Sequence, residues 1–152
     1  MSADLGVKIQ LGLEELETVH KQITSLVKQT NSSDAGDIET AAACAMLHSF
    51  YTEMEKILKL IARDWDDRMP SSESWHKDLL NQMATATDKR LAILTPDLVE
   101  TLSEFLAFRH LFRGASIALM RWNKLSPLVT KVEFTFTQFN ARIKAFRASC
   151  LK

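Results

Sequence analysis

Glycine and proline are scarce in this sequence, which has four Gly and three Pro in 152 residues. All-β folds use both residue types repeatedly in their tight turns, so the scarcity argues against such a fold. It favours long helices joined by short connections. The length fits one domain with its own core, and the hydrophobic share of 46% and charged share of 25% are ordinary for a globular protein. We therefore expect a single all-α domain over residues 1–152.

Several kinds of targeting segment are also missing. No run of about 18 apolar residues occurs, so the sequence predicts no membrane-spanning helix and no membrane partner. The opening stretch MSADLGVKIQ has no basic start followed by an apolar run, and we expect no secretory signal. Two cysteines, Cys44 and Cys150, lie far apart in the chain, which indicates reduced thiols in a cytoplasmic protein.

Metal and nucleotide motifs are absent from the sequence. It contains no HExxH, no paired cysteines and no two histidines four residues apart, which are the common patterns of metal ligands on helices and loops. It also has no Gly-rich phosphate loop, which excludes nucleotide binding by a P-loop or a Rossmann turn. We expect neither a metal nor another cofactor.

Charge is balanced over the whole chain but unevenly distributed along it. Lys and Arg together number 19, as do Asp and Glu. Residues 105–152 hold nine Lys or Arg and a single acid, Glu133, so this part carries +8 and residues 1–104 carry −8. A basic last third can attract RNA phosphates. The alternative is that the two parts pair with each other inside the fold or across a dimer.

Apolar residues recur at helical spacing through most of the chain. The spacing predicts a first helix over about residues 4–30, a cap-and-turn cluster at 31–37, a second helix over 38–67 and a short helix over 75–85. With two more helices in the second half, the pattern indicates an antiparallel four-helix bundle with an additional short helix.

Two proline-containing segments predict the starts of the later helices. In TPDL, Thr95 is the expected N-cap and Pro96 occupies the first helical position, where its missing N–H costs nothing. Ser126 and Pro127 predict the same start for a last helix that reaches about residue 151. Gly114 costs a helix about 1 kcal/mol relative to alanine and therefore predicts an early end of the helix that begins at Thr95.

The segment FLAFRHLFRGASIAL, residues 105–119, concentrates cationic and titratable groups. Arg109 and Arg113 are four residues apart and share one helix face, and His110 lies between them and position 114. Guanidinium groups donate paired hydrogen bonds to phosphate, and imidazole exchanges a proton near neutral pH. Such triples also occur on ordinary helix surfaces, so the spacing leaves both a phosphodiester site and a plain polar patch open.

The wider sequence resembles the HepT-like branch of the HEPN superfamily over roughly residues 40–150. Three stretches carry the resemblance: LHSFYTEMEKILKLIAR from residue 47, P-S-x-E-x-W-H-x-x-L-L at 70–80, and F-R-H-L-F-R at 108–113. The resemblance implies an all-helical, HEPN-like fold that forms a homodimer. It also implies a toxin–antitoxin component, often an RNase that cleaves without metal. The usual neutralising partner is a small nucleotidyltransferase of the minimal (MNT) type.

The family's catalytic pattern is an Arg, four to six intervening residues and a His, often with a Tyr two positions later. Arg109 matches the Arg, but with four residues between, Gly114 and Ser116 stand where the His and Tyr belong. Cleavage needs a base for the 2′-OH and a cation for the charge that develops on the phosphate. The resemblance therefore implies a site that keeps its Arg and lacks its base. Ser116 is also a poorer acceptor for the AMP that the partner can add to the Tyr.

Other side chains are candidates for the same groove. His110, one turn from position 114, could replace the missing base, and together with Arg109 it forms the candidate catalytic pair. The cations expected to contact RNA are Arg113, Arg121 and Lys124.

Tyr51 and His76 could line the groove, the former as a donor and the latter as a contact to RNA or to the partner. The alternatives are a tyrosine at the edge of the core and a helix start anchored by Trp75. Glu53 or Glu55 could pair with an arginine of residues 109–113.

Three functional hypotheses follow. The first is a dimeric RNase toxin or a close descendant of one, and the second is a non-catalytic HEPN protein that binds RNA or a nucleotidyltransferase. The third is a helical adaptor whose basic stripe has no specific ligand.

Overall fold

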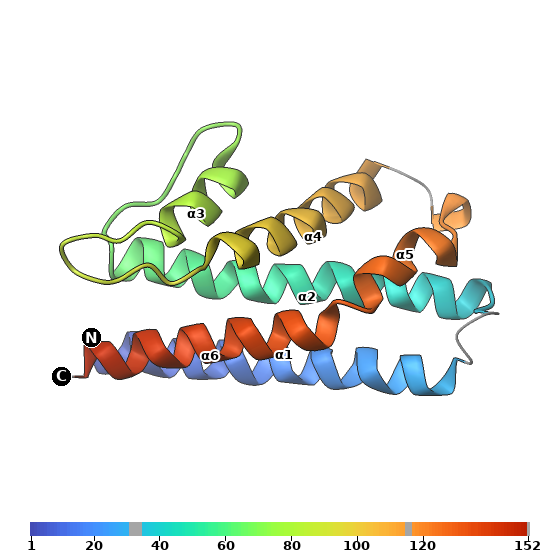
Figure 1. The fold of residues 1–152 in the computed structure, drawn as a ribbon, viewed down its shortest axis with the longest axis horizontal. Coiled ribbons are helices and arrows are strands. Elements are labelled where there is room, and N and C mark those ends of the chain that lie inside the picture. Colours follow the sequence, from blue (N-terminus) through green and yellow to red (C-terminus); the bar gives the residue numbers. More distant parts are fainter. Residues whose placement is uncertain (31–34, 115–116, 152) are drawn as a thin grey trace.

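The chain folds into a bundle of four long helices, which Figure 1 shows. The computed structural model describes residues 1–30, 35–114 and 117–151. Helices α1 (Ala3–Gln29), α2 (Asp37–Asp64), α4 (Pro96–Gly114) and α6 (Val132–Cys150) alternate in direction, and each contacts the next, with α6 returning to α1. The described residues contain no strand. The predicted antiparallel four-helix bundle is confirmed, and no helix in the described part of the chain is long and apolar enough to cross a membrane.

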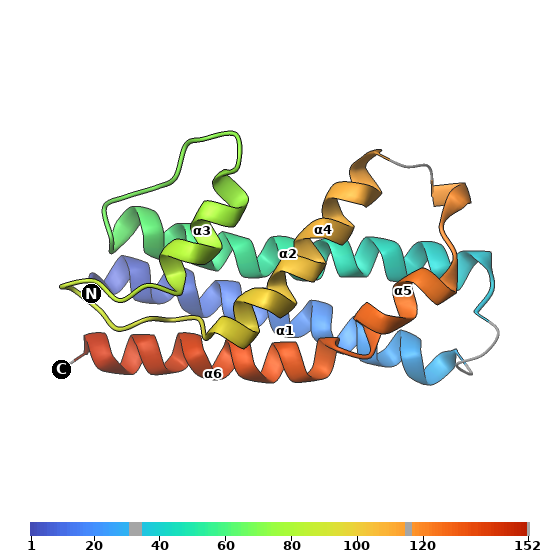
Figure 2. The ribbon, with the colours of Figure 1, turned by 45° about the horizontal axis from the view of Figure 1, so that its top comes forward.

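The remaining elements of the bundle all contact α2. Helix α3 (Trp75–Met83) is the predicted short helix, and it contacts both α2 and α4. After α4, the short turn η1 (Ile117–Leu119) and helix α5 (Trp122–Val129) return the chain along α2 to the start of α6. In Figure 2, α3 and α4 lie over α2, with α4 inclined to it. Helix α2 is therefore the central element, in contact with α1, α3, α4 and α5.

Helices α1 and α2 form an extensive contact. The apolar stripe of α1 is buried as its spacing predicts, with Leu5, Ile9, Leu13, Leu16 and Ile23 all in the core. At Gly12 an added Cβ would lie only 2.8 Å from Cγ1 of Ile57. Any larger residue at this position would require the Ile57 side chain to shift, so the glycine allows the two helices to pack without that change.

Aromatic side chains of α2 and α4 meet in the interior. Phe50 of α2 and Phe105 of α4 are 0% and 1% exposed, and their rings meet edge to face with centroids 5.4 Å apart. Burying a side chain of this size contributes about 1.5–3 kcal/mol to folding. The packing fixes the middle of α4 against α2, one turn before Arg109.

Helix α4 begins and ends where the sequence predicts. The hydroxyl oxygen of Thr95 accepts a hydrogen bond from the backbone N–H of Leu98 at 3.2 Å, which confirms Thr95 as the N-cap. The helix ends at Gly114. The predicted early end is therefore confirmed, and Gly114 occupies the last helical position.

The predicted start of the last helix at Ser126 and Pro127 is wrong. Helix α5 begins four residues earlier, at Trp122, and contains Pro127, with no side-chain cap at Arg121. The earlier start buries Leu125 completely. Proline cannot donate to the carbonyl four residues before it, so it weakens the helix, which ends at Val129. A separate helix, α6, then starts at Val132.

A buried ion pair fixes the long connection between α3 and α4. Arg90 donates to both carboxylate oxygens of Asp66, with distances of 2.7 and 2.6 Å, and their side chains are 1% and 4% exposed. Gln82 of α3 also donates to Asp66, at 2.9 Å. From α6, Arg142 donates to the backbone carbonyl of Ile93 at 2.5 Å. The connection is thereby bound to the ends of α2 and α3 and to α6.

We expect Asp66→Asn to lower the free energy of unfolding by about 3–5 kcal/mol, because the change leaves the buried Arg90 without its counter-charge. Denaturant unfolding followed by circular dichroism measures this loss. Asp4→Asn is the matched control, since Asp4 and Lys8 form an exposed pair 2.6 Å apart, for which we expect a change of less than about 1 kcal/mol. Equal effects of the two substitutions would contradict the prediction.

Candidate functional site

A buried carboxylate, Glu55 of α2, joins three helices. Its side chain is 5% exposed. One carboxylate oxygen accepts a hydrogen bond from Nη1 of Arg109 in α4 at 2.8 Å, and the other accepts from Nδ1 of His76 in α3 at 2.7 Å. A buried charge requires such partners, because an unpaired one costs several kcal/mol. The predicted pairing of Glu53 or Glu55 with an arginine of α4 is confirmed for Glu55.

Arg109 has a defined orientation in this contact. Its side chain is 14% exposed, and the carbon at the centre of its guanidinium lies 5.7 Å from the ring centroid of Tyr51. The aromatic face and the Glu55 carboxylate attract the same cation from two sides. Its Nε is buried with no hydrogen-bond partner. The guanidinium is thus positioned by groups of α2 before any ligand arrives.

Two further polar groups of α2 lie on the same helix stripe. His48 and Tyr51 precede Glu55 by seven and four residues, which places all three on one face of the helix. His48 Nδ1 and Arg109 Nε are both buried without a hydrogen-bond partner, and the buried Tyr51 hydroxyl lies beside the Glu55 carboxylate. Buried polar atoms are nearly always paired in native proteins, so this group of unpaired atoms beside Arg109 marks a candidate functional site.

The same surroundings shift the pKa values of both groups. Burial, followed by the negative charge of Glu55, raises the pKa of Tyr51, so its hydroxyl stays protonated at neutral pH. Burial, followed by the positive charges of Arg109 and Arg113, lowers the pKa of His48. His48 is therefore neutral at pH 7, and its ring packs at 5.6 Å from that of Phe112.

His76 lies at the start of α3, next to Trp75. The two rings stack with their centroids 3.6 Å apart, and Nζ of Lys59 lies 5.2 Å from the centroid of the Trp75 ring. The His76 side chain remains 25% exposed. The stacking and the hydrogen bond to Glu55 fix its ring. The structure thus brings together three of the sequence candidates: Arg109, His76 and Tyr51.

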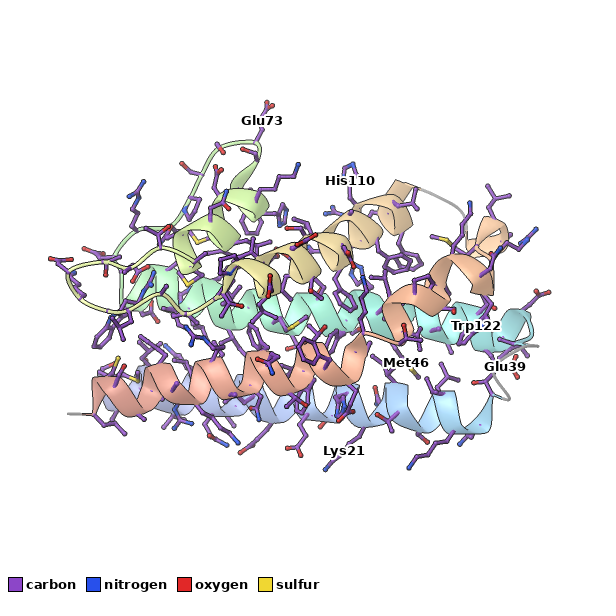
Figure 3. All side chains as sticks on the ribbon, viewed as in Figure 1. Lys21, Glu39, Met46, Glu73, His110 and Trp122 are labelled. Atoms are coloured by element: carbon purple, nitrogen blue, oxygen red, sulfur yellow. The ribbon has the colours of Figure 1, made fainter. Side chains whose placement is uncertain are left out.

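His110 and Arg113 lie outside this cluster. Both are exposed, and Figure 3 draws the His110 side chain on the side of α4 that is turned away from α2. Gly114 has open space around it, because a Cβ added there would meet nothing within 4 Å. Ser116, the other altered position, lies outside the described residues. The candidate base His110 and the candidate cation Arg109 therefore face different directions from α4.

The other predicted RNA contacts follow α4 in the chain. Arg121, just before α5, donates to the backbone carbonyls of Ala118 and Met120 at 3.0 and 3.1 Å. Lys124 is exposed on α5. Two ion pairs of the described residues join a cation of the basic part of the chain, residues 105–152, to an acid of the acidic part, residues 1–104. They are Arg109 with Glu55 and Lys131 with Glu104. Among the described residues, Arg113 and Lys124 form no ion pair and stay available to an anion.

Sequence reasoning missed the link between Glu55 and His76. The signal available was the polar stripe of His48, Tyr51 and Glu55 within an otherwise apolar face of α2. The partner of Glu55 could not be identified from spacing, because His76 is on a separate helix. The position of that helix depends on the connection that the Arg90–Asp66 ion pair holds in place. The described residues contain no group of three or more His, Cys, Asp or Glu that could bind a metal ion.

We expect His48 to titrate below 6.5, its ordinary pKa, because burial and two nearby arginines disfavour the protonated ring. The unfolded chain then binds the proton at a higher pH than the folded chain does. The free energy of unfolding should therefore fall as the pH is lowered from about 6.5 toward the folded pKa of His48. NMR titration of the ring signals, assigned with His48→Gln, measures the pKa.

Arg113→Gln is the companion variant for this titration. Removing this exposed cation should raise the pKa of His48 by a small amount, because burial is the larger cause of its shift. Lys21→Gln, on α1, should leave it unchanged. A His48 pKa at or above 6.5 in the unmodified protein would contradict the assignment.

Comparison with known proteins supports the sequence resemblance. Neither the comparison with curated proteins nor the comparison with solved structures gave a match. A family model described as HepT-like protein matches residues 42–150. The match covers most of α2 and extends through α3, α4 and α5 to the end of α6, so it includes Glu55, His76 and Arg109. The chain therefore belongs to the HepT-like family of the HEPN superfamily.

Proposed function

We propose that this HepT-like protein is the RNA-directed component of a toxin–antitoxin pair, and that Arg109 binds the phosphodiester of the RNA. The observation that carries the proposal is the orientation of Arg109 by the buried Glu55 and the Tyr51 ring. A cation oriented in advance stabilises the charge that develops on a reacting phosphate without having to rearrange. Its fork of N–H donors also matches the geometry of phosphate oxygens.

The surrounding charge supports an RNA ligand. Arg113 lies one turn after Arg109 and forms no ion pair among the described residues, and Lys124 is likewise unpaired and exposed. Cations near the primary contact contribute to RNA affinity by releasing the counterions bound to phosphates. Arg121 extends the same basic part of the chain. We place the RNA backbone along these side chains, with the reacting phosphate at Arg109.

A second candidate function follows from Gly114. At this position the family's pattern requires a His as the base, and a glycine can neither accept nor donate a proton through a side chain. The second candidate is therefore a non-catalytic HEPN protein that binds RNA or an MNT-type nucleotidyltransferase through the same groove. Either candidate fits a homodimer that acts within a toxin–antitoxin pair. Cleavage of RNA separates the two.

We expect Gly114→His to increase RNA cleavage, because it returns an imidazole that can give or take a proton to the motif position and the structure leaves open space there. The increase should reach about 10²-fold, the lower end of what a positioned base contributes. The test compares induced expression of the variant and of the unmodified chain, following growth and the integrity of total RNA. Gly114→Gln is the control of similar size without a basic nitrogen, and equal cleavage by both variants would contradict the expectation.

We expect the RNA affinity of the purified protein to fall as salt rises and Arg113→Gln to reduce the slope of this dependence by about one charge. Arg109→Gln should weaken binding further, because it removes the primary phosphate contact. Fluorescence anisotropy with a random-sequence RNA pool measures both effects. Lys21→Gln is the control, since Figure 3 places Lys21 on the opposite side of the bundle from His110. Equal losses in the Arg109 and Lys21 variants would refute the proposed RNA contact.

A further inference from the structure

We propose that His76, oriented by Glu55, is the general base that accepts the 2′-OH proton of RNA bound at Arg109. The inference rests on the proposed function, because it takes RNA as the substrate. The base would then be on α3, whereas His110 and the motif position 114 are both on α4. Three features of the contact support it: the state of the His76 ring, its access to solvent and the carboxylate that it shares with Arg109.

The hydrogen bond to Glu55 determines which nitrogen of His76 carries the proton. A carboxylate paired with an arginine only accepts hydrogen bonds, so His76 must donate its Nδ1–H across the 2.7 Å contact. In a neutral imidazole with the proton on Nδ1, Nε2 carries the free lone pair. Nε2 is the atom that must accept a proton from substrate. Glu55 therefore selects the tautomer that a base requires.

The ring is also fixed and accessible. Stacking on Trp75 at 3.6 Å restricts its rotation, and the nearby Lys59 restrains Trp75 in turn. The side chain is 25% exposed, and no described residue forms a hydrogen bond with Nε2. Nε2 is thus free to contact a ribose hydroxyl.

His76 and Arg109 are neighbours because they bind the two oxygens of the same carboxylate, at 2.7 and 2.8 Å. A phosphate bound to the remaining donors of Arg109 would place the adjoining ribose beside α3. General base catalysis requires the accepting nitrogen within hydrogen-bond reach of the proton that it takes. His110, which is exposed on the face of α4 turned away from α2, does not share this carboxylate.

The reaction balances without any further reagent. Nε2 of His76 takes the proton of the 2′-OH, the 2′-oxygen forms a bond to phosphorus, and the bond from phosphorus to the 5′-oxygen breaks. The 5′-oxygen takes a proton, either from the imidazolium of His76 or from water. Arg109 stabilises the negative charge on the phosphate oxygens, and Glu55 stabilises the imidazolium. The products are a 2′,3′-cyclic phosphate and a 5′-hydroxyl end.

The experiment measures cleavage of a random-sequence RNA pool by the purified full chain. His76→Asn is the central variant, because its amide can still donate to Glu55 but has no basic nitrogen. We expect it to cleave about 10²–10⁴-fold more slowly than the unmodified protein, with RNA binding and thermal stability retained. The unmodified protein should leave 2′,3′-cyclic phosphate ends and should not cleave a DNA pool of the same sequences. His20→Asn is the matched control, remote on α1, and should cleave normally.

A second variant separates proton transfer from a structural role. In His76→Ala, free imidazole added to the solution should restore part of the cleavage, because it can occupy the vacated site and accept the proton. His76→Asn should not respond to imidazole, because its side chain still fills part of the site. Glu55→Gln tests the positioning role of the carboxylate. It should shift the rising, acidic limb of the pH profile of cleavage to lower pH, because the protonated form of the base would lose the negative charge that stabilises it.

Each other outcome overturns the inference. Normal cleavage by His76→Asn, or loss of cleavage in His110→Asn without loss in His76→Asn, places the base elsewhere. No cleavage by the unmodified protein, combined with salt-sensitive RNA binding that depends on Arg109, refutes the His76 assignment and leaves the proposed RNA contact standing. No such binding and no cleavage refutes the proposed function as well.

Discussion

The arrangement of the site depends on one constraint, the burial of the Glu55 carboxylate. A charge that is 5% exposed must be neutralised and hydrogen-bonded, and residues of two other helices contribute to this. Arg109 and His76 satisfy one oxygen each. Moving α3 or α4 along α2 would leave the charge unpaired, so the carboxylate sets the register of both helices.

Because of this constraint, the middle of α4 contacts the interior of the bundle and its last residue does not. Arg109 is bound to the interior through Glu55 and Tyr51, whereas Gly114 ends the helix in open space. Gly114, where the family's pattern has a His, therefore contributes no side chain to the interior, and the orientation of Arg109 does not depend on it. The polar groups that remain, on α2 and α3, are what a phosphate and a ribose would meet.

Much of the fold follows from local pattern. The stripe of α1, the N-cap at Thr95 and the helix end at Gly114 each depend on spacing or on one residue's backbone preference, and all are confirmed. The predicted helix start at Ser126 and Pro127 is wrong, because Pro127 lies inside α5 rather than in its first turn. Burial of Leu125 outweighed that local preference, as packing often does when it competes with the preference of a single residue.

By itself, the sequence determined the helical class, the number of long helices and the family, and it indicated Arg109 as a candidate residue. These depend on hydrophobic period, capping residues and a short motif, which are local properties of the chain. Only the tertiary structure decided that Glu55 rather than Glu53 pairs with Arg109, that His76 shares this carboxylate and that His110 faces away from it. The physical reason is that pairing across helices depends on register and rotation, which the buried ion pairs and close packing of the whole bundle fix together.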